Sequence, residues 1–189
     1  MTSEPPPTPD LQYGQTTSII LYKIYSNSNR QNAKMKASAG LLIYRYRDGI
    51  VEVFLIHPGG PFWKSKDDGS WSIPKGGFTA PEDPLSAARR EFQEETGFEA
   101  EGPFRALTPV HQSSYKVVHS WIAEGDYDAD KIRSNLCQVE WPPRSGKMID
   151  VPEADRAAWF DLATARKKIL KGQVPFLDEL EKILASPTK

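Results

Sequence analysis

The sequence predicts a mixed α/β domain in which helices cover a β-sheet, and three observations support this fold class. Two β-rich runs, 39–46 and 51–58, are separated by an Arg-Asp-Gly turn signal. A helical segment with clear start and stop signals follows at 84–96. Near the C-terminus, the segment 175–185 places apolar residues at helical spacing.

The remaining elements follow the same strand-then-helix order. In chain order, they are a glycine-rich charged loop at 59–70, a short strand at 71–74 leading into Lys-Gly-Gly-Phe, strands at 104–112 and 115–125, a polar insertion at 126–155 with one helical turn, a strand at 157–160, and a helix at 162–170 that Asp161 can cap. Together these elements amount to a single sheet with helices packed against it.

The bulk composition suits one soluble domain with an N-terminal extension. Of the 189 residues, 39% are hydrophobic and 26% are charged. The formal net charge is -1, so no global positive field draws the chain to a nucleic-acid duplex or to anionic lipid. The single cysteine, Cys137, excludes an internal disulfide and permits a reducing compartment. We therefore expect a cytoplasmic protein without membrane or duplex partners, and the sequence leaves its oligomeric state open.

Residues 1–36 differ in composition from the rest, and we expect them to form a flexible extension. The stretch "SEPPPTPD" is rich in proline and a poor candidate for packing. The run "SIILYKIY" is too short to span a bilayer. It is also a poor signal peptide, because Lys23 interrupts the apolar stretch. It suits either a short strand or an adherent tail. The globular domain is expected to span 37–187.

The helix predicted at 84–96 is defined at both ends by local chemistry. Asp83-Pro84 begins it, because an N-cap residue is followed by proline at the first helical position. Gly97 can end it in the left-handed conformation. At about 100° per residue, one face of this helix is apolar and is expected to pack on the core. Its members are Leu85, Ala88 and Phe92.

Three glutamates, Glu91, Glu94 and Glu95, form one acidic arc beside that apolar face. Like charges three or four residues apart destabilise a helix by roughly 0.2–0.5 kcal/mol per pair. Glu94 and Glu95 also lie near the negative end of the helix dipole. A divalent cation would relieve this repulsion, and an all-oxygen ligand set favours Mg²⁺, with Mn²⁺ as a substitute, over Zn²⁺. On charge alone, a solvated acidic face explains the pattern equally well.

The segment upstream of the helix adds a motif with fixed spacing. Residues 76–98 read "GGFTAPEDPLSAARREFQEETGF" and resemble the Nudix box, G-x5-E-x7-R-E-U-x-E-E-x-G-U with U apolar, at every fixed position. The resemblance covers about 37–185 through "SAGLLIYR", "HPGGPFW" and "WSIPKGGF". It implies a Nudix-type α/β/α sandwich with a mixed sheet between helices. "WSIPKGG" is also similar to the lead-in of Nudix diadenosine tetraphosphate hydrolases.

The reaction implied by this resemblance is Mg²⁺-dependent hydrolysis of a nucleoside diphosphate linked to another group. A dinucleoside polyphosphate such as diadenosine tetraphosphate is the preferred substrate. Nucleoside triphosphates, including oxidised ones, ADP-ribose-like compounds and capped RNA ends remain alternatives. A non-catalytic nucleotide-binding module is a further alternative, although such modules usually lose box glutamates that this chain keeps.

The resemblance also implies roles for the residues of the motif. Glu91, Glu94 and Glu95 become the metal carboxylates, and the Gly76 carbonyl becomes a further ligand. Glu94 is the first candidate for the base that deprotonates the attacking water, and Glu153 is the alternative. Bound Mg²⁺ would neutralise phosphate oxygens and acidify a water molecule.

Outside the carboxylates, Arg90 is expected to pair with Glu82 through a bidentate guanidinium and so to orient Glu91. Four side chains are candidates for contact with the substrate: two lysines for phosphate, a tyrosine that can stack on a base, and a histidine beside the glycine-rich loop. They are Lys75, Lys116, Tyr115 and His57. For each of the four, a structural or solvated role is the simpler alternative.

Overall fold

The computed structural model of the protein describes residues 36–113 and 116–186. These residues belong to one compact unit, Ala33–Lys189. Apart from Lys36, the extension predicted at 1–36 lies outside the described residues, and so does Tyr115.

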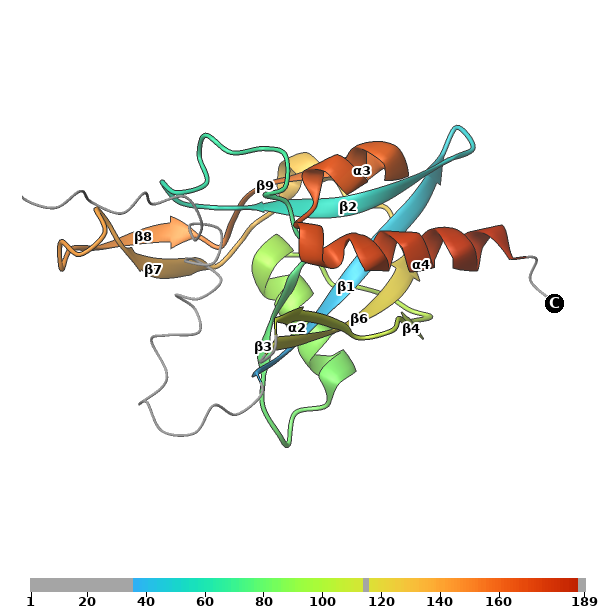
Figure 1. Ribbon diagram of the computed structural model, residues 1–189, viewed down its shortest axis with the longest axis horizontal. Coiled ribbons are helices and arrows are strands. Elements are labelled where there is room, and N and C mark those ends of the chain that lie inside the picture. Colours follow the sequence, from blue (N-terminus) through green and yellow to red (C-terminus); the bar gives the residue numbers. More distant parts are fainter. Residues whose placement is uncertain (1–35, 114–115, 187–189) are drawn as a thin grey trace, which may run out of the picture. The chain divides into compact units, whose positions relative to one another are not determined.

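A seven-stranded mixed sheet forms the centre of this unit (Figure 1). Its strands run in the order β4-β6-β1-β2-β9, with β3 pairing to β1 and β5 to β6. They are β1 (Lys36–Arg47), β2 (Ile50–Pro58), β3 (Lys75–Phe78), β4 (Arg105–Ala106), β5 (Val110–Ser113), β6 (Lys116–Glu124) and β9 (Ala154–Asp161). β1 and β6 are parallel, whereas the other pairings of this sheet are antiparallel. The sheet is therefore mixed, as predicted.

The turn between β1 and β2 shows how local sequence sets the register of the sheet. Arg47 pairs with Ile50, which leaves the two-residue loop Asp48-Gly49. Both loop residues have positive φ, 52° and 79°. Such a loop matches the right-handed twist of the strands that it joins. The turn signal in the sequence thus gives a tight hairpin.

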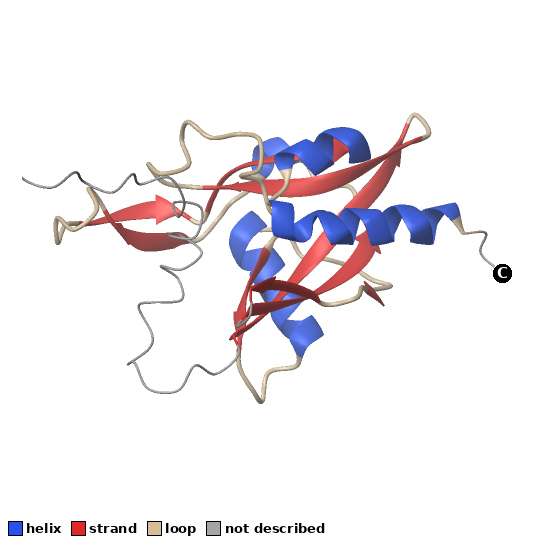
Figure 2. Ribbon diagram, viewed as in Figure 1, coloured by secondary structure: helices blue, strands red, loops and turns tan. Residues whose placement is uncertain are grey.

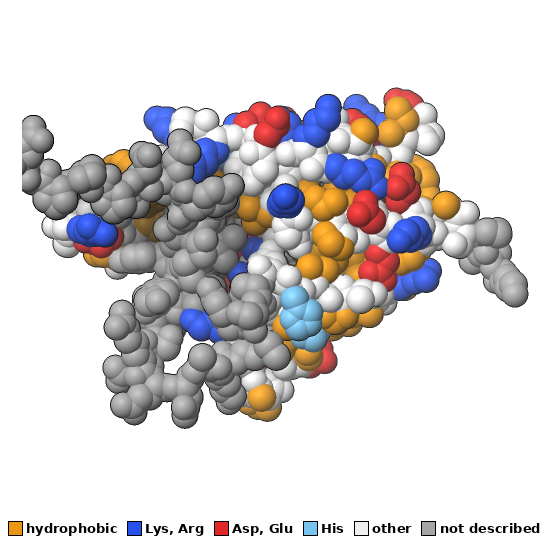
Figure 3. All heavy atoms as spheres, viewed as in Figure 1, with side chains coloured by type: hydrophobic (Ala, Val, Ile, Leu, Met, Phe, Trp, Pro, Cys, Tyr) orange, Lys and Arg blue, Asp and Glu red, His pale blue; other side chains and the backbone are white. Residues whose placement is uncertain are grey.

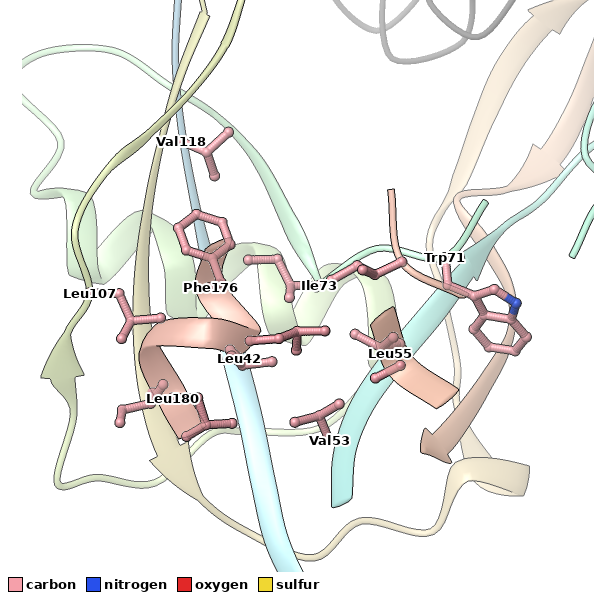
Figure 4. Close-up of a cluster of buried hydrophobic side chains, with 13 residues drawn as sticks. Leu42, Val53, Leu55, Trp71, Ile73, Leu107, Val118, Phe176 and Leu180 are labelled. Carbon is pink, nitrogen blue, oxygen red and sulfur yellow. The ribbon is translucent and has the colours of Figure 1, made fainter. Parts of the chain in front are cut away.

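Helices cover both faces of the sheet (Figure 2). α2 (Pro84–Thr96) packs on one face, where Ala39, Leu41, Phe54 and Phe92 belong to one buried cluster. α3 (Leu162–Lys168) and α4 (Val174–Ala185) cover the other face. There Phe176 and Leu180 of α4 lie in one cluster with Leu42 and Val118 of the sheet (Figure 4). The α/β/α arrangement is therefore confirmed.

The surface over α4 carries charged side chains of both signs, as expected for the solvent side of an amphipathic helix (Figure 3). Asp161 caps α3, because its Oδ1 accepts a hydrogen bond of 2.9 Å from the backbone of Thr164. None of the helices in the described part of the chain is both long and apolar enough to cross a membrane.

Three predicted elements differ from the structure. Residues 71–74 form only isolated bridges from Trp71 and Ser72, and the strand starts at Lys75. The strand predicted at 104–112 is divided into β4 and β5 around Pro109, which has no N–H for a ladder bond.

The polar insertion predicted at 126–155 is more ordered than expected. It contains the expected single turn, the 3-10 helix η1 (Ala129–Lys131). It also contains a separate two-stranded sheet of β7 (Leu136–Glu140) and β8 (Met148–Pro152). A second 3-10 helix, η2 (Lys171–Gln173), leads from α3 into α4.

Candidate functional site

The site is built on α2, whose two ends are set as the sequence predicts. Asp83 Oδ2 accepts a hydrogen bond of 2.9 Å from the backbone N–H of Ser86 at the start of the helix. At the other end, Gly97 has φ 80° and donates its N–H to the Gln93 carbonyl at 2.7 Å. Fixed ends determine the direction in which each side chain of the helix points.

The buried face of α2 is wider than predicted. Ala88 and Phe92 are fully buried, and Leu85 packs at the edge of the same cluster. Ala87 is fully buried as well, although the helical angles put it outside the apolar face. The buried surface of α2 therefore extends toward its acidic side, so that carboxylates of this helix lie inside the protein.

Glu91, Glu94 and Glu95 form what we call the carboxylate wall. Glu91 is 4% exposed and Glu95 is 8% exposed, whereas the Glu94 side chain is 35% exposed. Burying ionised carboxylates is costly unless cations or hydrogen-bond donors compensate for the lost water. The neighbours of the wall therefore define its chemistry.

Arg90 supplies part of this compensation. Its Nε donates to Glu82 Oε1 at 2.8 Å and its Nη2 to Glu82 Oε2 at 3.2 Å, the bidentate pair predicted from the sequence. Nη1 donates to Glu91 Oε1 at 2.8 Å and to Glu94 Oε2 at 3.0 Å, and Nη2 also reaches the Gly77 carbonyl at 3.4 Å. The hydrogen bonds from Arg90 lower the pKa of Glu82, and those to Glu82 raise the pKa of Arg90. One guanidinium thus joins the helix, its leading loop and β3.

β3 lies directly against the carboxylate wall. A Cβ atom at Gly76 would overlap the Glu91 carboxylate, so the absence of a side chain at Gly76 is what admits that carboxylate. The backbone N–H of Lys75 donates to Glu95 Oε2 at 2.7 Å. Two of the three glutamates are therefore held against the backbone of the neighbouring strand.

The residues of the wall fit a hard divalent cation. The donors are carboxylate oxygens next to a backbone segment, the ligand chemistry that Mg²⁺ takes in proteins. At Gly76 the Glu91 carboxylate lies in the space that a side chain would otherwise fill. Within the described residues, no three acidic, histidine or cysteine side chains already converge as a metal cage. Arg90 occupies part of the space between Glu91 and Glu94, so a cation would share these oxygens with it.

The alternative base, Glu153, lies close to the wall through the backbone. Asn135 donates its N–H to the Glu94 carbonyl at 2.8 Å, and Glu153 donates its N–H to the Asn135 carbonyl at 2.9 Å. Sequence reasoning could not find this link, because Glu94 and Glu153 are far apart in the chain and the connection depends on residues of the polar insertion.

His57, one of the candidates for contact with the substrate, lies in a structural environment. It is fully buried. Its Nδ1 lies 2.8 Å from Asp155 Oδ1, and its Nε2 lies 3.0 Å from the Lys66 carbonyl. Both ring nitrogens are therefore engaged, and the imidazole ties the loop at 59–70 to β9.

Lys75 and Lys116 lie on neighbouring parts of the sheet, whereas Tyr115 lies outside the described residues. Lys75 is half-buried at the start of β3, and Lys116 is 7% exposed at the start of β6. Burial, together with the positive charges of Lys75 and Lys36, lowers the pKa of Lys116 to about 7. Sequence reasoning missed Lys36, because its place beside Lys116 depends on the parallel register of β1 and β6.

Comparison with known proteins concerns the family and the fold of the chain. The family model described as the NUDIX domain matches residues 34–180. No curated protein matches the chain. Among solved structures, a binary complex of the C. elegans Ap4A hydrolase is 24% identical with a TM-score of 0.54, and the match covers 79% of this chain and 98% of that one.

Two bacterial structures have similar folds. The NUDIX domain of Shewanella oneidensis NrtR complexed with ADP ribose is 15% identical with a TM-score of 0.58, covering 87% of this chain and 98% of that one. A MutT/nudix family protein from Enterococcus faecalis is 16% identical with a TM-score of 0.54, covering 92% and 76%. At these identities the likeness shows the shared fold alone.

Proposed function

The chain belongs to the Nudix family, and from that premise we propose that it is a Mg²⁺-dependent pyrophosphohydrolase acting on a nucleoside diphosphate linked to another group. The observation that carries this proposal is the carboxylate wall. Two of its three glutamates are buried, yet both are held by specific donors beside a strand that has glycine where a side chain would collide. A helix that only faced solvent would need none of these contacts.

Each residue has a defined task in this proposal. Glu91, Glu94 and Glu95, with the Gly76 carbonyl, would hold Mg²⁺. The bound ion supplies neutralisation of phosphate oxygens and acidification of a water molecule. Arg90 is a positioning residue that holds Glu91 and Glu94 through its Nη1.

Proton transfer is assigned to Glu94, the most exposed glutamate of the wall. A base must reach the water that it deprotonates, and Glu91 and Glu95 are committed to buried contacts. Glu153 is the alternative base, because its backbone lies two hydrogen bonds away from Glu94.

The preferred substrate is a dinucleoside polyphosphate such as diadenosine tetraphosphate. The segment "WSIPKGG" and the fold shared with the C. elegans Ap4A hydrolase support this choice. Lys75 and Lys116 are proposed to contact its phosphates. An ADP-ribose-type compound is the second candidate, because the NUDIX domain of NrtR was solved in complex with ADP ribose.

The direct test is to incubate the purified chain with Mg²⁺ and a panel of diadenosine tetraphosphate, ADP-ribose, ATP, oxidised dGTP and capped RNA, and to separate the products by chromatography. Asymmetric cleavage of diadenosine tetraphosphate to ATP and AMP is the expected result. Glu94→Gln should lower the rate by about 100- to 10,000-fold, the usual contribution of a general base. Glu101→Gln removes an equivalent charge from an exposed position and should leave the rate unchanged.

A panel that stays intact in the presence of Mg²⁺ would overturn the hydrolase proposal. If ADP-ribose or another member then bound without being cleaved, and Glu94→Gln bound it equally well, a nucleotide-binding module would be the correct function.

A further inference from the structure

The segment 133–135, which closely follows η1, completes the C-terminal end of α2. The last carbonyl groups of a helix have no partner within the helix itself. Here Asn135 donates its backbone N–H to the Glu94 carbonyl at 2.8 Å, and Arg133 donates its N–H to the Thr96 carbonyl at 2.8 Å. A segment of the polar insertion therefore supplies the donors that this end of α2 lacks, and it bonds directly to the backbone of Glu94.

The same segment accepts hydrogen bonds from two consecutive residues of another part of the chain. Glu153 donates its N–H to the Asn135 carbonyl at 2.9 Å, and Ala154 donates its N–H to Ser134 Oγ at 2.9 Å. The Ser134 hydroxyl in turn donates to the Asn135 carbonyl at 3.3 Å. Ser134 thus closes a small network, because its hydroxyl accepts from one N–H group and donates to the acceptor of the other.

Glu153 is the single residue between β8 and β9 (Figure 1), and its carbonyl is bonded as well. Gly59 donates its N–H to the Glu153 carbonyl at 3.1 Å. The backbone of Gly59 can come this close because it has no side chain, since a Cβ there would overlap the Pro152 carbonyl. Both backbone polar groups of Glu153 are therefore held, although the residue belongs to neither strand.

The carboxylate of Glu153 also has a defined place. Its Oε2 is inaccessible to solvent, although the residue as a whole is half-buried. Farther along the chain, Asp155 Oδ1 lies 2.8 Å from His57 Nδ1. Each residue from 153 to 155 is thus held by a different partner. Support of this kind keeps a side chain within the small positional error that catalysis tolerates.

We propose that Ser134 is a positioning residue that fixes Glu153 relative to Glu94, and that Glu153 takes part in proton transfer during hydrolysis. The inference rests on the proposed function and adds to it a residue outside the Nudix motif. In this step one proton of the attacking water passes to a carboxylate. The water oxygen forms the new bond to phosphorus, and the bond from phosphorus to the leaving phosphate oxygen breaks. Ser134 acts through the backbone of Glu153 and carries no proton itself.

Steady-state kinetics on the cleaved substrate tests this role. Ser134→Ala removes both hydrogen bonds of the hydroxyl and should lower kcat by about tenfold with little change in KM, because contacts to the substrate remain. Ser134→Thr keeps a hydroxyl and should restore most of the lost rate. Ser145→Ala is the matched control and should leave kcat unchanged. It removes a hydroxyl of the β7–β8 turn that accepts a hydrogen bond of 3.2 Å from the backbone N–H of Lys147.

Glu153→Gln separates positioning from general support of the fold. This variant should lower kcat by about 100-fold, the lower end of the contribution of a positioned proton acceptor. Adding Ser134→Ala to it should then cause almost no further loss, because Ser134 acts only through Glu153. If Ser134 merely stabilised the insertion, Ser134→Ala would lower kcat by the same factor in both backgrounds, and that result would overturn the positioning role.

The two proposals fail in different ways. A chain that cleaves diadenosine tetraphosphate, with kcat unchanged by Glu153→Gln, would keep the hydrolase and overturn this inference. A chain that cleaves no member of the panel would overturn the hydrolase and, with it, the role of Ser134.

Discussion

Arg90 and Lys116 are two cations close to the same strand, but they have opposite surroundings. Arg90 donates to three carboxylates and one carbonyl, and its side chain is 37% exposed. Lys116 is 7% exposed, and the charges that shift its pKa are both positive. The first cation completes a network of carboxylates, whereas the second is buried beside two further positive charges.

The two cations therefore belong to two regions of opposite charge. The carboxylate wall concentrates negative charge, and Arg90 holds two of its carboxylates in place. Lys36, Lys75 and Lys116, which we call the lysine strip, lie close enough together that the positive charges of the first two lower the pKa of the third. Each region can be tested by removing its specific feature.

The largest expected effect comes from Gly76→Ala, which disturbs the contact between β3 and the carboxylate wall. Its Cβ would overlap the Glu91 carboxylate and displace it. Misplacing a catalytic group by about 1 Å can cost about 100-fold in rate, so kcat/KM should fall by at least about that factor. Gly77→Ala is the matched control, because its added Cβ would meet no atom within 4 Å. Equal activities of the two variants would mean that Glu91 does not need its place against β3.

The two regions also differ in how far the sequence predicts them. The carboxylate wall was predicted in detail because local sequence determines α2. Asp83-Pro84 and Gly97 fix the ends of the helix, and helical spacing fixes its faces. Ala87 was the exception, since burial by the sheet reaches beyond the apolar positions. The α/β/α layering followed from the same local patterns.

The lysine strip was only partly predicted, because it depends on pairing between distant strands. Lys36 and Lys116 meet through the parallel register of β1 and β6, which no local pattern encodes. The β7–β8 sheet was missed for a related reason: its strands are short and are joined by "WPPRSGK", which is typical of a loop. The surroundings of His57 were not predicted, because its glycine-rich neighbourhood does not reveal that Asp155 and the Lys66 carbonyl lie against its ring nitrogens.

Addition of Mg²⁺ tests the carboxylate wall through the stability of the folded chain. Mg²⁺ at about a hundredfold excess over its dissociation constant should stabilise the folded chain by about 2.7 kcal/mol and raise the melting temperature. Glu91→Gln should reduce this response, whereas Lys167→Met should keep it. A melting curve that does not respond to saturating Mg²⁺ would count against a metal site on α2.

Removing Arg90 should change the free energy of unfolding slightly less than Mg²⁺ does. Arg90→Met leaves Glu82, Glu91 and Glu94 without their shared guanidinium, and Glu91 is buried. Because Arg90 and Glu82 are partly exposed, solvent should limit the loss in free energy of unfolding to about 2 kcal/mol. Arg89→Met on the exposed side of α2 is the control. Urea denaturation would measure both, and a loss of equal size in the two variants would show that Arg90 acts only as a surface charge.

The smallest effect, and the one specific to the lysine strip, is a pH dependence of stability. The folded chain has the pKa of Lys116 lowered from 10.5 to about 7, through burial and the charges of Lys75 and Lys36. Between these two values the unfolded chain holds a proton that the folded chain has released, so this lysine makes stability rise with pH by about 1.4 kcal/mol per pH unit. Below pH 7 both states are protonated, and the cost of burying the charge is fully present. Urea unfolding at pH 7 and pH 8 should therefore show Lys116→Met losing its advantage over the wild type as pH rises, and a constant difference between the two proteins would contradict the buried, uncompensated cation.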